Sequence, residues 1–192
     1  FGRLDTMFGS MHYGIRPDII TIAKGLTSAY APLSGSIVSD KVYEVLMEGT
    51  DQIGPFGHGW TYSAHPIGAA AGVANLELID ELGLVANAGE TGAYLNRALQ
   101  EAVGDHPNVA EVRGEGMLAA VELAEDPGTR RFFDASRKVG PSIVAAMLKR
   151  GVISRAMPEG DILGFAPPLC LTPAEADTIA EATAEAIREV LG

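Results

Sequence analysis

The chain has 192 residues, of which 47% are hydrophobic, and a formal net charge of −11 from 25 acidic and 14 basic side chains. This is enough apolar material for one large or two small domains, whereas the negative charge would repel a nucleic-acid backbone. The single cysteine, Cys170, excludes an internal disulfide framework, and the sequence shows no signal-peptide pattern and no apolar run of membrane-spanning length. We therefore expect a cytoplasmic protein with no nucleic-acid or membrane partner, although its charge is compatible with a small anionic ligand.

The first half of the chain has the pattern of an α/β protein. Residues 1–17 are glycine-rich and turn-like, and the β-branched run of residues 19–22 predicts a buried strand that ends at Lys24 and Gly25. A second strand is expected over 32–39 and a helix over 40–47. A lysine at a strand end lies where open α/β sheets bind ligands, but a solvated lysine that protects the strand from aggregation is the commoner interpretation.

A loop rich in glycine, proline and aromatic residues is expected over residues 49–66. Long irregular loops of this kind are often functional. Pro66 is then well placed to begin a helix that ends at Gly83. The apolar stripe predicted for this helix consists of Ile67, Ala70, Ala71, Ala74 and Leu78.

The second half predicts a small α+β domain. A helix is expected over 84–103, and two strands over 109–123 meet at a bend around 113–116. Pro141 is expected to begin a helix through Arg150 that buries four apolar residues. These are Ile143, Val144, Met147 and Leu148. Strands over 152–157 and 162–166 flank a predicted turn at 158–161, and a capping box at Thr172–Glu175 begins the last helix. We expect one domain at 1–83 and a second at 84–192.

The residue types that carry catalysis leave lysine chemistry as the candidate. The four histidines and Cys170 lack the spacing of a zinc site, and no nucleophile elbow, P-loop or dinucleotide fingerprint is present. A lysine whose amine is activated by burial or a neighbouring charge forms Schiff bases with carbonyl groups. Pyridoxal phosphate uses such a lysine together with a phosphate cradle, a carboxylate on the pyridine nitrogen and an anchor for the substrate.

Two further positions could serve that chemistry. A hydroxyl of the glycine-rich loop, from Thr61 or Ser63, could hold a phosphate, although a hydroxyl that stabilises a turn is the commoner interpretation. Arg155 alternates with Ile153 and Met157 along a predicted strand and could offer two parallel hydrogen bonds to a carboxylate. Its alternative is a structural salt bridge, for example to Asp161.

Together these segments resemble the class III (omega) aminotransferases, pyridoxal-phosphate enzymes of fold type I, along essentially the whole chain. The resemblance is carried by the residues at 1–3, 13–26, 57–66, 113–117 and 167–169. The most specific blocks are Tyr13–Leu26 and the run from Gly57 to Pro66, which reads Gly-His-Gly-Trp-Thr-Tyr-Ser-Ala-His-Pro. The match is to the amine:pyruvate type and to the C-terminal portion of a protein more than twice this length.

The resemblance implies the fold, the cofactor and the roles of four residues. It implies an α/β fold in which the chain forms the end of the large domain plus a C-terminal α+β small domain. Lys24 matches the lysine that holds pyridoxal 5'-phosphate covalently and moves protons. Thr61 matches a residue that binds the cofactor phosphate across a homodimer interface, and Trp60 an aromatic residue that lines the shared active site. Arg155 is similar to the mobile arginine that pairs with a substrate carboxylate.

The same resemblance implies a transaminase that acts on small-molecule amine and keto-acid substrates. It moves an amino group between a primary amine or omega-amino acid and a keto acid such as pyruvate. Leu4-Asp5 stand where family members have Thr-Gly, and the family's aspartate for the pyridine nitrogen lies before the segment that matches Phe1-Gly2-Arg3. Two alternatives stay open: a same-fold aminomutase or racemase, and a non-catalytic fragment that acts only in association.

Overall fold

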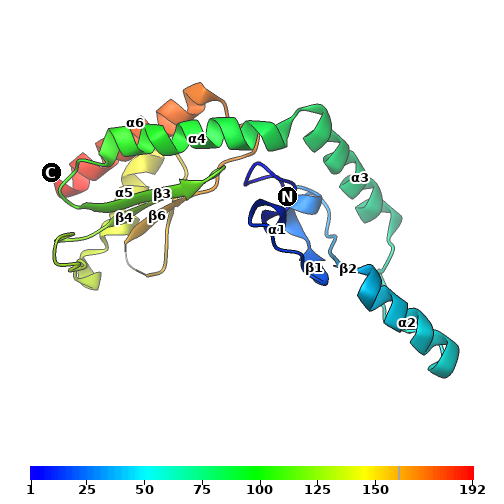
Figure 1. The fold of residues 1–192 in the computed structure, drawn as a ribbon. Coiled ribbons are helices and arrows are strands. Elements are labelled where there is room, and N and C mark those ends of the chain that lie inside the picture. Colours follow the sequence, from blue (N-terminus) through cyan, green and yellow to red (C-terminus); the bar gives the residue numbers. More distant parts are fainter. Residues whose placement is uncertain (160) are drawn as a thin grey trace. The chain divides into compact units, whose positions relative to one another are not determined.

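The computed structural model describes residues 1–159 and 161–192, and its backbone contacts divide the chain into two compact units. The first unit consists of residue 1 and residues 8–83, and the second of residues 2–7 and 84–192. Figure 1 labels their helices and strands. Across the described ranges, no helix is both long and apolar enough to cross a membrane.

The first unit contains two paired strands and three helices. In chain order its elements are α1 (Gly9–His12), β1 (Ile19–Ile22), the 3-10 helix η1 (Lys24–Leu26), β2 (Gly35–Val38), α2 (Asp40–Ile53) and α3 (Pro66–Glu81). Strands β1 and β2 are antiparallel, with Ile19 opposite Val38. The predicted order of strand, turn, strand and helix is confirmed, but α2 continues past residue 47, so the loop begins only at Gly54.

Burial in the first unit differs from the sequence prediction. Strand β1 alternates between exposed and half-buried residues and is not a buried strand, and α2 buries no residue. The predicted apolar stripe of α3 is also wrong, because Ile67 is 70% and Leu78 50% exposed, whereas Gly68, Gly72 and Ile79 are buried. The physical reason is close approach: a Cβ at Gly72 would lie 3.0 Å from Leu33 Cδ2. A pattern that selects large apolar side chains misses a face built from glycine.

The second unit is a four-stranded antiparallel sheet with helices packed on it. Its elements are α4 (Leu84–Val103), β3 (Val109–Glu115), β4 (Leu118–Leu123), η2 (Ala135–Arg137), α5 (Val139–Lys149), β5 (Arg155–Ala156), β6 (Ile162–Phe165) and α6 (Pro173–Leu191). The strand order is β3-β4-β6-β5. Helices α4 and α6 run side by side along the sheet, and α5 packs against α6 (Figure 1). The core lies between helices and sheet, and its largest fully buried side chains include Leu95, Leu99, Met117, Ile143 and Leu163.

Most predicted elements of the second unit are confirmed. Helix α4 spans 84–103 as predicted, and the capping box forms: Thr172 Oγ1 accepts from the Glu175 amide at 3.3 Å while the Glu175 carboxylate accepts from the Thr172 amide at 2.8 Å. Helix α5 begins two residues before Pro141, and Leu148, predicted buried, is 59% exposed. The strand predicted over 152–157 is reduced to Arg155–Ala156. The turn predicted at 158–161 includes Gly160, which lies outside the described residues.

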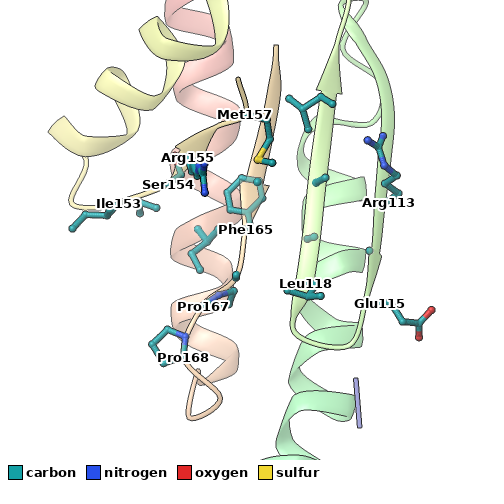
Figure 2. A pocket seen from close by; sticks show the side chains of 18 of the residues that line it. Arg113, Glu115, Leu118, Ile153, Ser154, Arg155, Met157, Phe165, Pro167 and Pro168 are labelled. Carbon is teal, nitrogen blue, oxygen red and sulfur yellow. The ribbon is translucent and has the colours of Figure 1, made fainter. Parts of the chain in front are cut away.

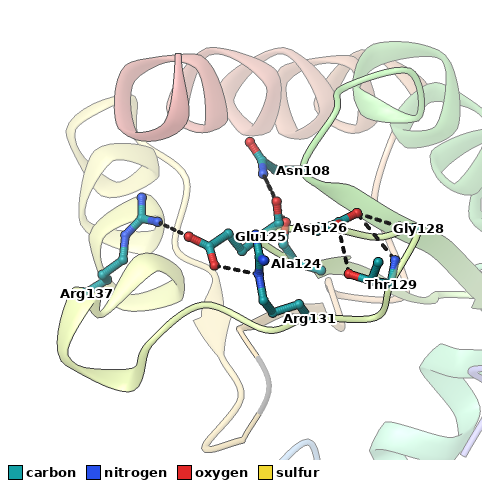
Figure 3. A network of polar contacts seen from close by, with 8 residues as sticks. All are labelled: Asn108, Ala124, Glu125, Asp126, Gly128, Thr129, Arg131 and Arg137. Atoms are coloured by element: carbon teal, nitrogen blue, oxygen red, sulfur yellow. Dashed lines mark hydrogen bonds and ion pairs between the residues drawn. The ribbon is translucent and has the colours of Figure 1, made fainter.

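The connection between β4 and η2 is anchored in the core by the buried Phe133 and is shaped over its exposed part by polar side chains (Figure 3). Asp126 accepts from the Gly128 amide at 3.0 Å and from the Thr129 hydroxyl at 2.7 Å, and the bond from Thr129 lowers the pKa of this carboxyl. Glu125 pairs with Arg131 at 3.0 Å and with Arg137 at 3.4 Å. Because these pairs are exposed, they shape the connection and contribute little stability each.

Candidate active site

Lys24 is the first residue of η1, directly after strand β1. Its side chain is exposed, and within the part of the chain that the structure describes its ammonium group forms no hydrogen bond or ion pair. The backbone around it is fixed, because the Lys24 carbonyl accepts from the amides of Thr27 at 3.2 Å and Ala29 at 3.1 Å. The amine is therefore carried on an ordered turn while remaining accessible.

The backbone of this turn is strained. Lys24, Ser28 and Ala29 have φ values of 52°, 48° and 61°, a left-handed region that residues with a Cβ rarely adopt. Such strain costs on the order of 1–3 kcal/mol per residue and persists where the surroundings impose it, most often at functional sites. Three strained residues within six make the Lys24 turn the leading candidate for a site in the first unit.

Helix α3 supplies the surroundings that impose this conformation. Asn75 Nδ2 donates to the carbonyls of Gly25 at 2.9 Å and Leu26 at 3.2 Å, and Asn75 Oδ1 accepts from the Ser28 hydroxyl at 2.6 Å. Sequence reasoning did not single out Asn75. An asparagine inside a helix carries no pattern of its own, and only the fold shows which backbone groups it meets.

The loop after α2 holds the other two predicted cofactor residues. Trp60 is 78% exposed, and its ring meets the His58 ring edge-on at a centroid distance of 5.7 Å. The amide of Trp60 donates to Ser63 Oγ at 2.8 Å, so Ser63 stabilises the turn in which Thr61 stands with its side chain exposed. Among the described residues, no hydrogen bond or ring contact joins Lys24 to Thr61 or Trp60.

Arg155 lies in the second unit, on the edge strand β5, and lines a pocket of about 1230 Å³. Figure 2 shows Arg155 and Arg113 on opposite sides of this pocket, with Met157 and Phe165 near Arg155. Glu111 and Glu122 each pair with the Arg113 guanidinium at 2.6 Å and raise its pKa, chiefly through the Glu122 hydrogen bond.

The two arginines of this pocket therefore differ in their freedom to bind an anion. Among the described residues Arg155 forms no ion pair, and the salt bridge to Asp161 that was its alternative is not made. Asp161 instead accepts from the Gly140 amide at 2.9 Å. The charge of Arg113 is already balanced by two carboxylates, whereas the exposed guanidinium of Arg155 is available to a carboxylate ligand.

The family model for aminotransferase class-III matches residues 1–187. The chain belongs to the class III aminotransferases. Members of this family are pyridoxal-phosphate-dependent enzymes, and the mixed α/β fold agrees with that of solved transaminases. The described residues contain no group of three or more histidine, cysteine, aspartate or glutamate side chains placed to hold a metal ion.

Named relatives cover most of this aminotransferase chain. It is 60% identical over 190 residues to the diaminobutyrate–2-oxoglutarate transaminase of Halomonas elongata, and the aligned region covers 99% of this chain and 40% of that protein. It is 41% identical over 180 residues to the putrescine–pyruvate aminotransferase of Pseudomonas aeruginosa, with coverages of 93% and 38%. The chain thus spans about two-fifths of the length of these curated relatives.

Solved structures agree with the sequence relatives. A transaminase from directed evolution by ancestral reconstruction superposes with a TM-score of 0.96 at 57% identity, covering 99% of this chain and 42% of that one. An (S)-enantioselective omega-transaminase from Thermomicrobium roseum gives a TM-score of 0.90 at 41% identity, with coverages of 100% and 42%. The fold of this aminotransferase chain is therefore that of the corresponding part of these enzymes.

The donor groups of the first unit fit pyridoxal phosphate. Lys24 offers an exposed primary amine on an ordered turn, which is the group that a Schiff base with the cofactor aldehyde requires. The Thr61 hydroxyl is exposed in an aromatic loop and is a suitable donor to a phosphate oxygen.

Proposed function

We propose that the whole protein is a transaminase that moves an amino group between a primary amine or omega-amino acid and a keto acid such as pyruvate. The observation that carries this proposal is the exposed amine of Lys24 on its strained, hydrogen-bonded turn. When bound, pyridoxal phosphate supplies an aldehyde that accepts the amino group and a ring that withdraws electrons from the substrate carbon.

Within this proposal each residue of the chain has one task. Lys24 holds the cofactor covalently and moves a proton to or from the reacting carbon through its Nζ. Thr61 donates to the cofactor phosphate in the second subunit of a homodimer, and Trp60 lines that shared site. The exposure of both side chains in the single chain supports this arrangement, since each is then available to another subunit. Arg155 binds the carboxylate of the keto acid or the omega-amino acid.

Covalent trapping tests the role of Lys24. Borohydride reduction of the full-length enzyme with its cofactor, followed by peptide mass mapping, should place the pyridoxyl label on Lys24. Lys24→Ala should abolish both labelling and turnover, whereas Lys41→Ala, which removes an exposed lysine that pairs with Asp18 at 3.4 Å, should leave both unchanged. A label on another lysine, or substantial turnover without Lys24, would refute the proposal.

The two arginines of the second-unit pocket provide a matched test of substrate binding. Arg155→Gln should raise KM for the keto acid by roughly 10-fold or more, because a charge-assisted hydrogen-bonded pair contributes about 1.5–3 kcal/mol. Arg113→Gln should leave that KM unchanged, because Glu111 and Glu122 already balance this guanidinium. Equal effects of both substitutions would contradict the assignment of Arg155.

A second acceptor is favoured by one relative. The protein that is 60% identical to this chain is a diaminobutyrate–2-oxoglutarate transaminase, so 2-oxoglutarate is the candidate acceptor to compare with pyruvate. Initial rates with each keto acid and one amine donor decide between them. The same assay without any keto acid separates transamination from the aminomutase and racemase alternatives, since only transamination needs the acceptor.

The fragment alternative makes a different prediction. A non-catalytic piece that acts only in association should bind no cofactor as the isolated 192 residues, while a longer polypeptide is active. The first unit supports such dependence on further polypeptide, because α2 buries no residue and Ile53 and Tyr30 are 90% and 93% exposed. Activity of the isolated chain with added pyridoxal phosphate would eliminate this alternative.

A further inference from the structure

We propose that Asn75 is a positioning residue that sets the direction in which Lys24 presents its amine. This inference rests on the proposed role of Lys24. Asn75 lies on α3, about fifty residues after the turn that it contacts, and its side-chain amide makes three hydrogen bonds to that turn. Two go from Nδ2 to the Gly25 and Leu26 carbonyls, and one comes to Oδ1 from the Ser28 hydroxyl.

The chemistry of the partners fixes the orientation of the Asn75 amide. A carbonyl oxygen can only accept, so the two carbonyls require the NH₂ group of the amide and exclude its oxygen. The oxygen is then left facing Ser28, whose hydroxyl can donate. Reversing the amide would lose both carbonyl bonds, and for this reason the arrangement has one stable form.

Packing brings Asn75 close enough to make these bonds. The face of α3 that meets the turn carries Gly68 and Gly72, where a Cβ would lie 3.3 Å from the Pro32 carbonyl oxygen and 3.0 Å from Leu33 Cδ2, respectively. Leu26, the last residue of η1, is buried. The two glycines let helix α3 approach the segment 24–33. Asn75, one turn after Gly72, then lies close enough to donate to the backbone carbonyls of Gly25 and Leu26.

The turn needs such a fixed point because its own conformation is unfavourable. Lys24, Ser28 and Ala29 all occupy the left-handed region. Strained backbone relaxes unless its surroundings hold it, and a lysine side chain has four freely rotating bonds beyond its Cα. Asn75 spans both sides of the turn, since it contacts the residue directly after Lys24 and also Ser28. Loss of the Asn75 hydrogen bonds would allow the base of the Lys24 side chain to change direction while helix α3 stays in place.

Two substitutions in the full-length holoenzyme test the carbonyl bonds. Asn75→Asp keeps the shape and the acceptor for Ser28 but removes both donors, and Asn75→Leu removes all three bonds. Glu77→Gln is the matched control, because it makes the reverse amide–carboxylate exchange on an exposed position of the same helix. Apoenzyme is mixed with pyridoxal phosphate and quenched with borohydride at intervals, and the label on Lys24 is measured by peptide mass mapping.

We expect both Asn75 variants to capture the cofactor at Lys24 more slowly and to lower kcat, each by roughly 10- to 100-fold, the loss typical of a misplacement near 1 Å. KM for both substrates should stay within about twofold, since the substrate contacts are elsewhere. Glu77→Gln should match the wild type. A purely structural role would lower melting temperature and active fraction without slowing capture by the folded enzyme.

Several outcomes would overturn the proposal. One is capture and kcat at wild-type values in folded Asn75→Asp, even if Asn75→Leu is impaired, because the carbonyl bonds would then be unnecessary. If neither Asn75 variant folds, Ser28→Ala replaces them: it removes one bond and should slow capture several-fold with an unchanged melting temperature, and wild-type capture would refute the proposal. Absence of label on Lys24 in the wild type would instead refute the proposed function.

Discussion

Replacement of Gly92 in α4 by alanine is a test in which helix preference and packing predict opposite changes in the free energy of unfolding. Alanine in a helix interior is favoured over glycine by roughly 0.5–1 kcal/mol, so helix preference alone predicts that Gly92→Ala stabilises the protein. In the structure, a Cβ at Gly92 would overlap the carbonyl of Gly116 and lie 2.8 Å from the Met117 amide nitrogen. These are backbone atoms of the β3–β4 turn, which cannot rotate away as a side chain can.

The packing effect should win. Overpacking of a well-packed interior costs about 1–3 kcal/mol, and because the overlap here is with backbone we expect the upper half of that range, about 2–3 kcal/mol. Subtracting the helix gain of about 0.5–1 kcal/mol leaves a net loss of about 1–2.5 kcal/mol. For a chain of 192 residues each kcal/mol lowers the melting temperature by about 2–4 °C, which predicts a fall of about 2–10 °C. Differential scanning calorimetry or circular dichroism of the purified protein measures it.

Gly49 of α2 is the matched control for this substitution. It is also a glycine inside a helix, but a Cβ there would meet nothing within 4 Å. Gly49→Ala should therefore raise stability by the helix gain alone, roughly 0.5–1 kcal/mol. The reasoning is refuted if Gly92→Ala raises the melting temperature as Gly49→Ala does, because the close approach of α4 to the turn would then not constrain the fold.

Two further predictions concern the second unit. Thr172→Ala should lower the free energy of unfolding by about 0.5–2 kcal/mol because it removes the N-cap of α6, whereas Thr172→Ser should retain most of the capping stabilisation. Urea unfolding measures the difference as a shift of the midpoint at constant slope. Equal midpoints for the Ala and Ser variants would contradict the capping argument. His106 accepts from the Asn108 amide through Nδ1, and burial together with the charge of Arg188 lowers its pKa below the ordinary 6.5. The fold favours the neutral His106 ring, so the stabilisation from this ring is fully present at pH values above its ordinary pKa. This stabilisation is lost as the pH falls through the lowered pKa of the folded state. Wild type should consequently lose more melting temperature than His106→Gln on going from neutral to mildly acidic pH, and parallel losses would contradict it.

Local sequence signals predicted the elements whose determinants are local. The capping box at Thr172–Glu175 contains both partners within four residues, and the helix over 84–103 places Leu95 and Leu99 on one buried stripe. The family resemblance rested in the same way on contiguous blocks around Lys24 and Trp60. Boundaries were less predictable: α2 continues past residue 47 through Gly49, a residue that disfavours helix, and ends only before Gly54.

Features that depend on distant residues could not be predicted. The buried face of α3 is made by Gly68 and Gly72, which an apolar pattern does not count, and its partners lie some forty residues earlier in the chain. Asn75 was missed because its hydrogen-bond partners are set by that packing. The sequence is compatible with either a paired or an unpaired Arg155, and only the fold shows that Asp161 accepts from the Gly140 amide.

In each unit, a glycine and an asparagine on one helix hold a neighbouring turn in place. In α4, Gly92 lets the helix meet the β3–β4 turn, and Asn96, one turn later, donates to the carbonyls of Gly116 at 3.2 Å and Leu118 at 3.4 Å. In α3, Gly72 and Asn75 do the same at the Lys24 turn. In each case glycine removes the side chain that would keep backbone from helix, and asparagine supplies donors to the carbonyls brought near. The pairing predicts that the effects of substituting the two residues are coupled: without the glycine the asparagine lies farther from the carbonyls, and without the asparagine the close approach leaves carbonyls without this donor.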